Sequence, residues 1–538
     1  MGAFADSATE SHDDAVRGAR GVSPRQACWL SIFLYPVMLA LLAVPIFSVV
    51  VPPLGDYINH LARMHVLSAY ADSAALQTNY VVIWKLTPYL GMDLIVPRMI
   101  RFMNIYTAGR VFLCVCLLQF VLGTAAVHAA LFRRFSPWPV ASALFAYSWV
   151  FSLGFVNYLF GAGVWLLAFA SWIVLSRRPP AWRIAIGSVL SFAVFFSHYF
   201  AFFGYMLCVG TYELGVWLSA RDRSLLRRGA IAFCPFIIPL IIFWYASQEQ
   251  GGGITRYGTP HEKLTALLSP VAFPGARFDL IILGFSLVVL AAGLLMRKLR
   301  LATAMHMPLA ALGLAAVAMP ILLSGVWGID YRLPVVFVYL LIASCEWRDV
   351  RARIAFPTAL VMVLLLAANI GSIVLAWQPL GKRFDEFRAA LQVIPRGARV
   401  IAFREDVGVD PELRRGPLFL YTHLPLLAVI ERDAYVPYLF KHPMMSIAAA
   451  PALRSIDTPH GHPMPLPNLI EGLDPVKGPA MLGEVDPEGR HNYWGDWPSH
   501  YDYAIELSFG AHPELPAQLK LLKSGQIFNI YRIDKFAR

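Results

Sequence analysis

Long apolar stretches recur from about residue 27 to about residue 377 of the chain. A bilayer core about 30 Å thick needs roughly 20 helical residues to cross, so these stretches predict an α-helical, polytopic membrane protein. We count about eleven spans of this kind, near residues 27–50, 106–131, 138–153, 158–175, 183–200, 202–219, 230–247, 279–296, 305–325, 333–346 and 355–376. The third and fourth are short and closely joined, so they are interpreted as full spans, a tilted hairpin or a re-entrant pair.

The pattern changes after Trp377, where proline and charged residues become frequent and no apolar run is long enough to span. Helical spacing at 384–394 and strand-like runs at 399–403, 503–507 and 527–531 predict a soluble α/β domain. The predicted organisation is a disordered tail (1–26), a transmembrane domain (27–377) whose first outer loop is long (51–105), and the α/β domain (378–538).

Charge orients the predicted spans. Of the 538 residues, 58% are hydrophobic and only 15% are charged, which excludes a cytosolic enzyme, a disordered chain and a disulfide scaffold. The net charge of +11 comes largely from basic clusters in every second link, at Arg17–Arg25, Arg133–Arg134, Arg177–Arg183, Arg221–Arg228, Arg297–Arg300 and Arg348–Arg353. The positive-inside rule predicts that these links and the N-terminus are cytoplasmic and that the C-terminal domain is extracytoplasmic. Because the clusters lie in separate short loops, we expect no nucleic-acid partner.

The first outer loop opens with a helical pattern that places Asp56, His60 and Arg63 on one face. Asp56 is placed to act as a general base, His60 can tune that base or bind a metal, and Arg63 can hold an anion. The alternative is that Asp56 caps the helix and the charges form surface pairs. In either case the pattern predicts a helix lying on the outer membrane surface.

A second group of polar residues, Asp330, Tyr331 and Arg332, comes directly before the tenth predicted span. A guanidinium at this boundary suits bidentate binding of a lipid phosphate, and Asp330 can pair with Arg332 or serve the site. The alternative is an interfacial anchor of tyrosine and arginine.

Two further candidates lie near the outer ends of other spans. His198 lies near the outer end of the fifth span and is interpreted either as facing a cavity or as a structural histidine. The loop 248–278 contains three consecutive glycines and Arg256, which predicts a segment able to close over a substrate or a plain linker.

The order of these parts resembles the GT-C superfamily of integral-membrane glycosyltransferases. The pieces that match are Gly55-Asp56-Tyr57 after the first span, Asp330–Pro334, and Tyr501-Asp502-Tyr503 with the strand 527–531. The resemblance implies a bacterial inner-membrane enzyme that moves a sugar from a polyprenyl-phosphate donor to a glycan, lipid or protein acceptor. It also implies that Asp56 deprotonates the acceptor hydroxyl and that Arg332, with Arg63 or Arg256, holds the lipid phosphate.

Cofactors and other functions are left open by the residues. There is no phosphate-binding loop or dinucleotide fingerprint, so neither ATP nor a nucleotide cofactor is expected, whereas a divalent cation depends on a second acidic residue such as Asp72 or Asp93. A transporter or flippase of a lipid-linked glycan would need an ionisable residue within the membrane, for which Glu213 is the main candidate. A non-catalytic membrane subunit would make the polar residues of the first outer loop individually replaceable.

Overall fold

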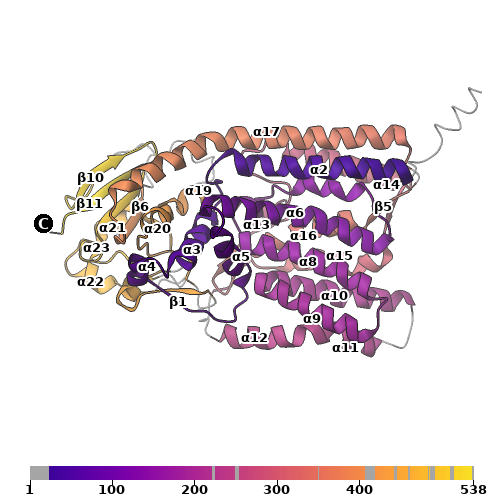
Figure 1. The fold of residues 1–538 in the computed structure, drawn as a ribbon, viewed down its shortest axis with the longest axis horizontal. Helices are drawn as coiled ribbons and strands as arrows, with labels where there is room; N and C mark the ends of the chain where they lie inside the picture. The colour runs from indigo at the N-terminus through magenta and orange to yellow at the C-terminus, as the bar shows by residue number, and fades with distance from the viewer. Residues whose placement is uncertain are drawn as a thin grey trace, which may run out of the picture.

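The computed structural model describes residues 24–220, 225–248, 254–348, 350–405, 419–441, 445–458, 461–482, 484, 491–508 and 514–535. It consists of a bundle of helices that run along the long axis and an α/β unit at one end of that bundle (Figure 1). The predicted tail lies outside the described residues as far as residue 23, and the first helix begins at Pro24.

Within the described residues, seven helical segments are long and apolar enough to cross a membrane. They are α2 (Pro24–Ser48), α6 (Ile105–Phe132), α8 (Val156–Leu175), α9 (Pro180–Ser197), α10 (Tyr199–Ala220), α11 to α12 (Leu225–Phe233, Cys234–Phe236 and Ile237–Ser247) and α17 (Ala352–Ala390). Three shorter apolar helices accompany them, namely α14 (Asp279–Leu295), α15 (His306–Ala318) and α16 (Arg332–Ser344). These helices confirm the predicted polytopic helical class, but the ninth predicted span, residues 305–325, is helical only as far as Ala318.

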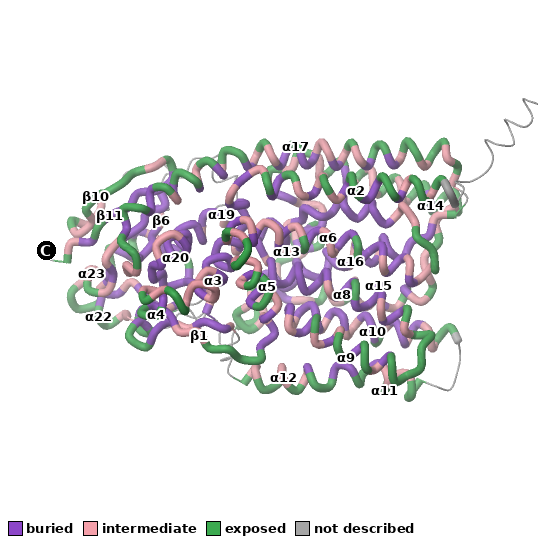
Figure 2. Tube along the Cα trace, in the orientation of Figure 1, coloured by how far each residue is buried: buried purple, intermediate pink, exposed green. Residues whose placement is uncertain are grey.

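The third predicted span, residues 138–153, does not form a full helical span, which is one of the three interpretations left open for it. The chain there forms the 3₁₀ helix η1 (Trp138–Phe145) and the short helix α7 (Trp149–Ser152). Pro137 and Pro139 at its start lack amide hydrogens, which does not favour a regular α-helix beyond the first turn. The segment is buried, and Tyr147 Oη donates to the Leu42 carbonyl at 2.7 Å. Figure 2 shows that buried residues are concentrated in the interior of the bundle. Residues 138–153 thus pack against other protein segments and do not form the membrane-spanning helix that their apolar composition suggests.

The α/β unit contains a five-stranded mixed sheet in the order β10-β11-β9-β6-β8. Strand β6 pairs in parallel with β8 and β9, and β11 pairs antiparallel with β9 and β10. The strands are β6 (Val400–Arg404), β8 (Met464–Pro465), β9 (Tyr503–Leu507), β10 (Leu519–Ser524) and β11 (Phe528–Ile533). The short helices around them are η4 (Leu391–Val393), α19 (Phe419–Thr422), η5 (Leu424–Leu426), α20 (Leu427–Arg432), η6 (Pro451–Ile456), α21 (Leu466–Glu471), α22 (Lys477–Met481) and α23 (Trp497–His500). The sheet confirms the predicted α/β character and the three predicted strands.

Helix α17 joins the two parts of the molecule. It is continuous from Ala352 to Ala390, so the predicted last span and the first part of the predicted helix 384–394 form one element that reaches into the α/β unit (Figure 1). Pro379 lies inside this helix without ending it. The predicted boundary at 377/378 therefore falls in the middle of a helix.

The first outer loop packs into the α/β unit. It forms α3 (Tyr57–Ala69), α4 (Ala74–Asn79), β1 (Tyr80–Val82) and α5 (Leu90–Ile100), and β1 pairs antiparallel with β7 (Ile447–Ala449). His65 Nε2 lies 2.8 Å from Asp433 Oδ1, which ties α3 to the end of α20. Most residues of α3 are buried, because the α/β unit covers that helix and its polar face.

Three of the basic links lie together at the end of the bundle away from the α/β unit. There β2 (Leu299–Leu301) pairs antiparallel with β5 (Cys345–Trp347), and Glu346 lies 3.1 Å from Arg134 and 2.9 Å from Arg348. At the opposite end, α13 (Pro260–Leu267) and the hairpin of β3 (Leu322–Leu323) and β4 (Val326–Trp327) precede α16. The two ends of the bundle therefore differ in charge as well as in what they contact.

Candidate functional site

Asp56 lies at the turn between the first span and α3, and its backbone is fixed by the bundle. Its amide donates to the Leu153 carbonyl at 2.9 Å, and the preceding glycine amide donates to the Ser152 carbonyl. Gly154 has φ +74°, and a Cβ there would lie 2.7 Å from the Asp56 amide nitrogen, so a glycine is needed for this close approach. The Asp56 side chain makes no cap hydrogen bond to α3, so the capping alternative does not describe it.

The Asp56 carboxylate instead contacts a histidine from the α/β unit. His423 Nε2 lies 3.3 Å from Asp56 Oδ1, and the histidine is buried while 28% of the aspartate side chain is exposed. Asn59 determines which ring nitrogen of His423 carries the hydrogen. The Phe440 amide donates to Asn59 Oδ1 at 2.8 Å, which leaves Asn59 Nδ2 to donate to the Tyr438 carbonyl and to His423 Nδ1 at 3.2 Å.

Because His423 Nδ1 accepts a hydrogen bond, the ring hydrogen is on Nε2 and points to Asp56. The chain Asn59–His423–Asp56 thus orients a partly exposed carboxylate through two buried side chains. We call these three residues the Asp56 relay. A carboxylate held in this way keeps its second oxygen available to take a proton from a substrate hydroxyl.

His60 lies one turn further along α3 and is buried against Phe440, with the two ring centroids 5.3 Å apart. Burial, and then the nearby Arg63 and His423, lower the pKa of His60 well below its ordinary value. The ring is therefore neutral at physiological pH and lines the relay without adding charge.

Arg63 is fully buried and already paired. Its Nη2 lies 2.6 Å from Asp93 Oδ1 of α5, and its Nη1 lies 2.7 Å from the Met445 sulfur. Burial raises the pKa of Asp93, and the charge and hydrogen bond of Arg63 oppose that rise. Arg63 is thus paired with a carboxylate inside the protein, which competes with its predicted role of binding an anion. The same pair involves Asp93, one of the two acidic residues proposed above as partners of Asp56 in cation binding.

Arg332 is the first residue of α16, and its guanidinium is enclosed by aromatic rings. The guanidinium carbon lies 4.6 Å from the ring centroid of Phe155, 5.5 Å from Phe200 and 5.8 Å from Tyr158, a group that we call the Arg332 cage. Arg332 is buried, and neither its Nε nor its Nη1 has a hydrogen-bond partner among the described residues. A buried guanidinium with unmet donors is costly unless an anion completes it, so the cage fits a phosphate or carboxylate group.

His198 stands beside this cage, between α9 and α10. Its ring centroid lies 5.4 Å from Tyr158 and 5.2 Å from Tyr89, and its Nδ1 accepts the Phe200 amide at 3.0 Å. Burial raises the pKa of Tyr89 well above its ordinary value, and the positive charges of Arg332 and Arg63 oppose that rise. His198 therefore has a fixed orientation and shares its neighbours with Arg332.

The Asp56 relay and the Arg332 cage meet at the turn that joins α7 to α8. Leu153 accepts the Asp56 amide, and Phe155, two residues later, supplies the ring nearest to the Arg332 guanidinium. The structure thus brings Asp56 and Arg332 to one end of the bundle, at the base of the α/β unit. One element supplies both contacts, so the two groups are positioned relative to each other by a rigid turn.

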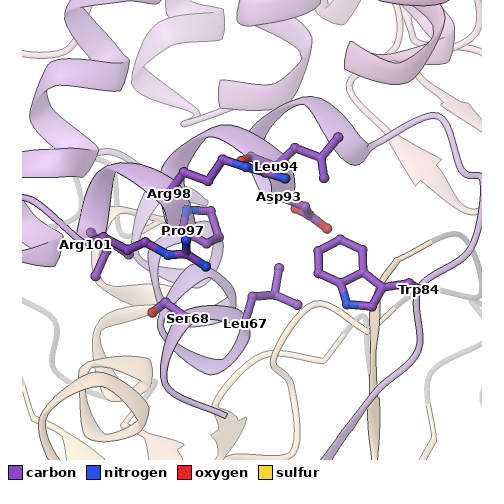
Figure 3. Close-up of a pocket in the computed structure, with 9 residues that line it drawn as sticks. Leu67, Ser68, Trp84, Asp93, Leu94, Pro97, Arg98 and Arg101 are labelled. Atoms are coloured by element: carbon purple, nitrogen blue, oxygen red, sulfur yellow. The ribbon is translucent and has the colours of Figure 1, made fainter. Parts of the chain in front are cut away.

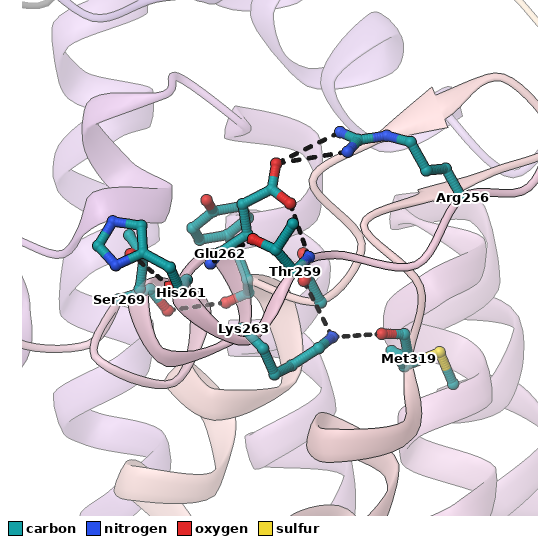
Figure 4. Close-up of polar contacts among 10 residues, drawn as sticks. Arg256, Thr259, His261, Glu262, Lys263, Ser269 and Met319 are labelled. Carbon is teal, nitrogen blue, oxygen red and sulfur yellow. Dashed lines mark hydrogen bonds and ion pairs between the residues drawn. The ribbon is translucent and has the colours of Figure 1, made fainter.

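Asp330, Tyr331 and Arg256 are placed around the entrance to α16 and not within the cage. Asp330 Oδ2 lies 3.0 Å from Lys263 Nζ, which also donates to the Met319 carbonyl, and burial raises the pKa of Asp330 against the effect of Lys263. Arg256 is half exposed and faces Glu262 at 3.4 Å (Figure 4). Asp330 therefore pairs with a lysine rather than with Arg332, and Arg256 is held outside the cage.

Two further predictions concern a segment that closes over the substrate and a divalent cation. The glycines at 251–253, on which the closing-segment hypothesis depends, lie outside the described residues. Across the part of the chain that the structure describes, no three or more of His, Cys, Asp and Glu are grouped so as to hold a metal ion.

Sequence reasoning missed His423, Asn59 and the aromatic residues of the cage. His423 stands alone in a segment 367 positions after Asp56, and no spacing links it to the first outer loop. Asn59 lies in the predicted helix, where burial by the α/β unit and not sequence gives it a role. Phe155 and Tyr158 follow the glycine turn at Gly154, and in the sequence they resemble ordinary core residues.

The fold of this chain, with its bundle, first outer loop and α/β unit, is similar to that of two solved structures at low sequence identity. The particular structures that show this are two of ArnT from Cupriavidus metallidurans, each covering 93% of this chain and 97% of that chain. The apo structure matches with a TM-score of 0.52 at 10% identity. The structure bound to undecaprenyl phosphate matches with a TM-score of 0.51 at 11% identity. No family model and no curated protein matches this sequence.

Proposed function

We propose that the protein is a membrane glycosyltransferase that moves a sugar from a polyprenyl-phosphate donor to an acceptor hydroxyl. The observation that supports this most directly is that one turn of the bundle contacts both an oriented carboxylate, Asp56, and a buried guanidinium, Arg332, whose Nε and Nη1 have no hydrogen-bond partner among the described residues. Similarity to a solved structure bound to undecaprenyl phosphate supports the donor class. The basic links at the far end of the bundle support an extracytoplasmic site in the inner membrane, with the N-terminus cytoplasmic.

In this proposal Arg332 binds the donor phosphate through its Nε and Nη1 donors. Asp56 accepts the proton of the acceptor hydroxyl, and the oxygen attacks the anomeric carbon of the sugar. The bond between that carbon and the phosphate oxygen breaks, and its electron pair stays on that oxygen. The leaving group is the polyprenyl phosphate. Arg332 stabilises the charge that grows on the leaving oxygen, and the breaking phosphate linkage supplies the driving force without ATP.

The aromatic rings around Arg332 have a second role in this proposal. They remove water from the guanidinium, and charge interactions are stronger where water is excluded. They also leave no protein carboxylate in contact with the guanidinium among the described residues, so the donor phosphate meets an uncompensated cation. His198 and Tyr89 lie where they can contact the sugar hydroxyls next to that phosphate.

Glu213 bears on the alternative of an ion-coupled transporter or flippase. It lies near Arg183 and Arg228, and its Oε1 also accepts the Trp172 indole N–H at 3.1 Å. A carboxylate neutralised in this way ties α8, α9, α10 and α11 together. This structural role favours the glycosyltransferase over ion coupling at this residue.

A transfer assay with purified protein in proteoliposomes tests the function itself. Radiolabelled undecaprenyl-phosphate hexoses and pentoses are supplied as donors, with total membrane lipid and glycan extracts as acceptors. We expect release of undecaprenyl phosphate and appearance of label in an acceptor fraction for at least one donor. Absence of both across the donor panel, with folded protein, would contradict the proposal.

Replacing His423 tests the relay. In His423→Ala the carboxylate loses its orienting donor, and we expect kcat to fall roughly tenfold to a hundredfold, as for other residues that orient a reacting group. The donor KM should change little, because Arg332 is untouched. His423→Gln restores an N–H donor and should recover part of kcat, as measured in the same transfer assay.

The matched control is His65→Ala, because His65 also contacts the α/β unit but pairs with Asp433 rather than Asp56. Both variants remove a histidine from the same interface, so both can lower the melting temperature. Equal kcat losses in the two variants, with no recovery in His423→Gln, would show that His423 acts only through stability.

A further inference from the structure

A second polar cavity lies on the outer side of α5, separated from the Asp56 relay by the buried pair of Arg63 and Asp93. It has a volume of about 600 Å³, and Leu67, Ser68, Trp84, Asp93, Arg98 and Arg101 are among its lining residues. Figure 3 shows the Trp84 ring on one side, Arg98 and Arg101 on the other, and the Asp93 carboxylate between them. The reaction proposed for Asp56 and Arg332 does not use this cavity.

The charges of the lining favour an anion. Arg98 donates one hydrogen bond to the Leu94 carbonyl of its own helix, which leaves most of its five N–H donors free. Among the described residues, no carboxylate pairs with Arg98 or Arg101. Because Arg63 neutralises Asp93, the cavity carries an excess of two positive charges.

Asp93 adds a hydrogen-bond acceptor to the floor of the cavity. Its side chain is only 1% exposed, and its Oδ2 makes no hydrogen bond of normal geometry to a described residue, although the nearby Ser446 hydroxyl acts to lower the pKa of Asp93. A buried carboxylate oxygen of this kind is satisfied by a donor on a ligand. The cavity thus combines cations for a phosphate with an acceptor for a hydroxyl group.

The cavity lies at the level of the membrane surface. Arg101 precedes by a few residues the span of α6, which begins at Ile105. The 28 residues of α6 extend about 42 Å, longer than a bilayer core of about 30 Å, so the start of α6 reaches the headgroup layer. Phe102 is 85% exposed and Trp84 is 56% exposed, and exposed aromatic residues are typical of this layer.

We propose that this cavity binds the headgroup of an anionic phospholipid in the leaflet next to the α/β unit. Arg98 and Arg101 hold the phosphate, a headgroup hydroxyl donates to Asp93, and the Trp84 ring covers the glycerol. The acyl chains then lie along the exposed apolar surface of α5 and α6. This binding does not depend on transfer activity, so either proposal can fail without the other.

Calorimetric titration of the purified full-length protein in detergent tests the proposal. The probe is dioctanoyl-phosphatidylglycerol, which has both the phosphate and the hydroxyls, and dioctanoyl-phosphatidylcholine is the zwitterionic comparison without a hydroxyl. We expect the first to bind at least about tenfold more tightly. Glycerol 3-phosphate, which lacks the acyl chains, should bind at least about tenfold more weakly than the phosphatidylglycerol.

The variants separate this cavity from general attraction to a charged surface. Arg98→Ala with Arg101→Ala should weaken phosphatidylglycerol binding at least about tenfold, because charged hydrogen bonds are lost. Arg277→Ala is the control, since Arg277 is an exposed arginine beside the start of α14 and no described carboxylate pairs with it; it should change the affinity less than about twofold. Unchanged affinity in the double variant would overturn the proposal, and equal binding of glycerol 3-phosphate would overturn the lipid as the source of the phosphate.

Discussion

Asp56→Asn is expected to abolish sugar transfer while the protein stays folded. The amide has the shape of the carboxylate, and its oxygen still accepts from His423 Nε2, so the relay keeps its geometry. The amide cannot take a proton from the acceptor hydroxyl, and general-base catalysis contributes about 10²–10⁴-fold. We therefore expect kcat to fall about a thousandfold in the proteoliposome assay, with donor binding and melting temperature unchanged.

Asp72→Asn is the matched control for this substitution. Asp72 is an exposed acidic residue of the same outer loop and is one of the two candidates for a second acidic residue. We expect its transfer rate to stay within about twofold of the natural protein, as for most surface substitutions. Substantial transfer by Asp56→Asn would refute the assignment of Asp56 as the base.

Arg332→Met is expected to separate activity from stability. Methionine fills much of the space of the arginine side chain but removes the charge that binds the donor phosphate. Charge-assisted hydrogen bonds contribute about 1.5–3 kcal/mol each, so we expect kcat/KM for the donor to fall at least about a hundredfold. The melting temperature should stay the same or rise, because a buried unpaired cation is removed. Thermal unfolding and donor titration measure the two effects.

Arg183→Met is the control at the other end of the bundle. Arg183 is also buried and also stacks on an aromatic ring, with its guanidinium carbon 4.1 Å from Trp172, but it pairs with Glu213. Removing it leaves the buried Glu213 carboxylate with Arg228, 3.6 Å away, as its remaining basic partner, and breaking a buried pair costs up to about 3–5 kcal/mol, so this variant should melt at a clearly lower temperature. If Arg332→Met were destabilised as much as Arg183→Met and still bound donor normally, Arg332 would be structural.

Much of the fold can be predicted from the sequence because lipid imposes a simple rule on it. The spans α2, α6 and α8 begin and end within three residues of the predicted bounds, since apolar composition over a fixed length determines them. Residues 138–153 break the rule because they pack inside protein, where a 3₁₀ helix is tolerated. The polar face of α3 is buried for a similar reason, because it packs against the α/β unit and does not face water.

The candidate site is only half predictable. Asp56 and Arg332 can be identified from the sequence because few charged residues lie at the outer ends of the predicted spans. His423 carries no such signal, since its role depends on contacts between segments hundreds of residues apart. Arg63 shows the converse: a charge on the predicted face is taken up by Asp93, a pairing that only the three-dimensional packing of α3 on α5 reveals.

A structure of the protein bound to undecaprenyl phosphate, determined by electron cryomicroscopy in lipid nanodiscs, tests the central proposal of one shared site most directly. The proposal predicts phosphate density within hydrogen-bonding distance of the Arg332 guanidinium, about 2.7–3.0 Å, in a cavity that also exposes the Asp56 carboxylate. Phosphate density elsewhere on the bundle, with Arg332 still closed off by Phe155, Tyr158 and Phe200, would contradict it.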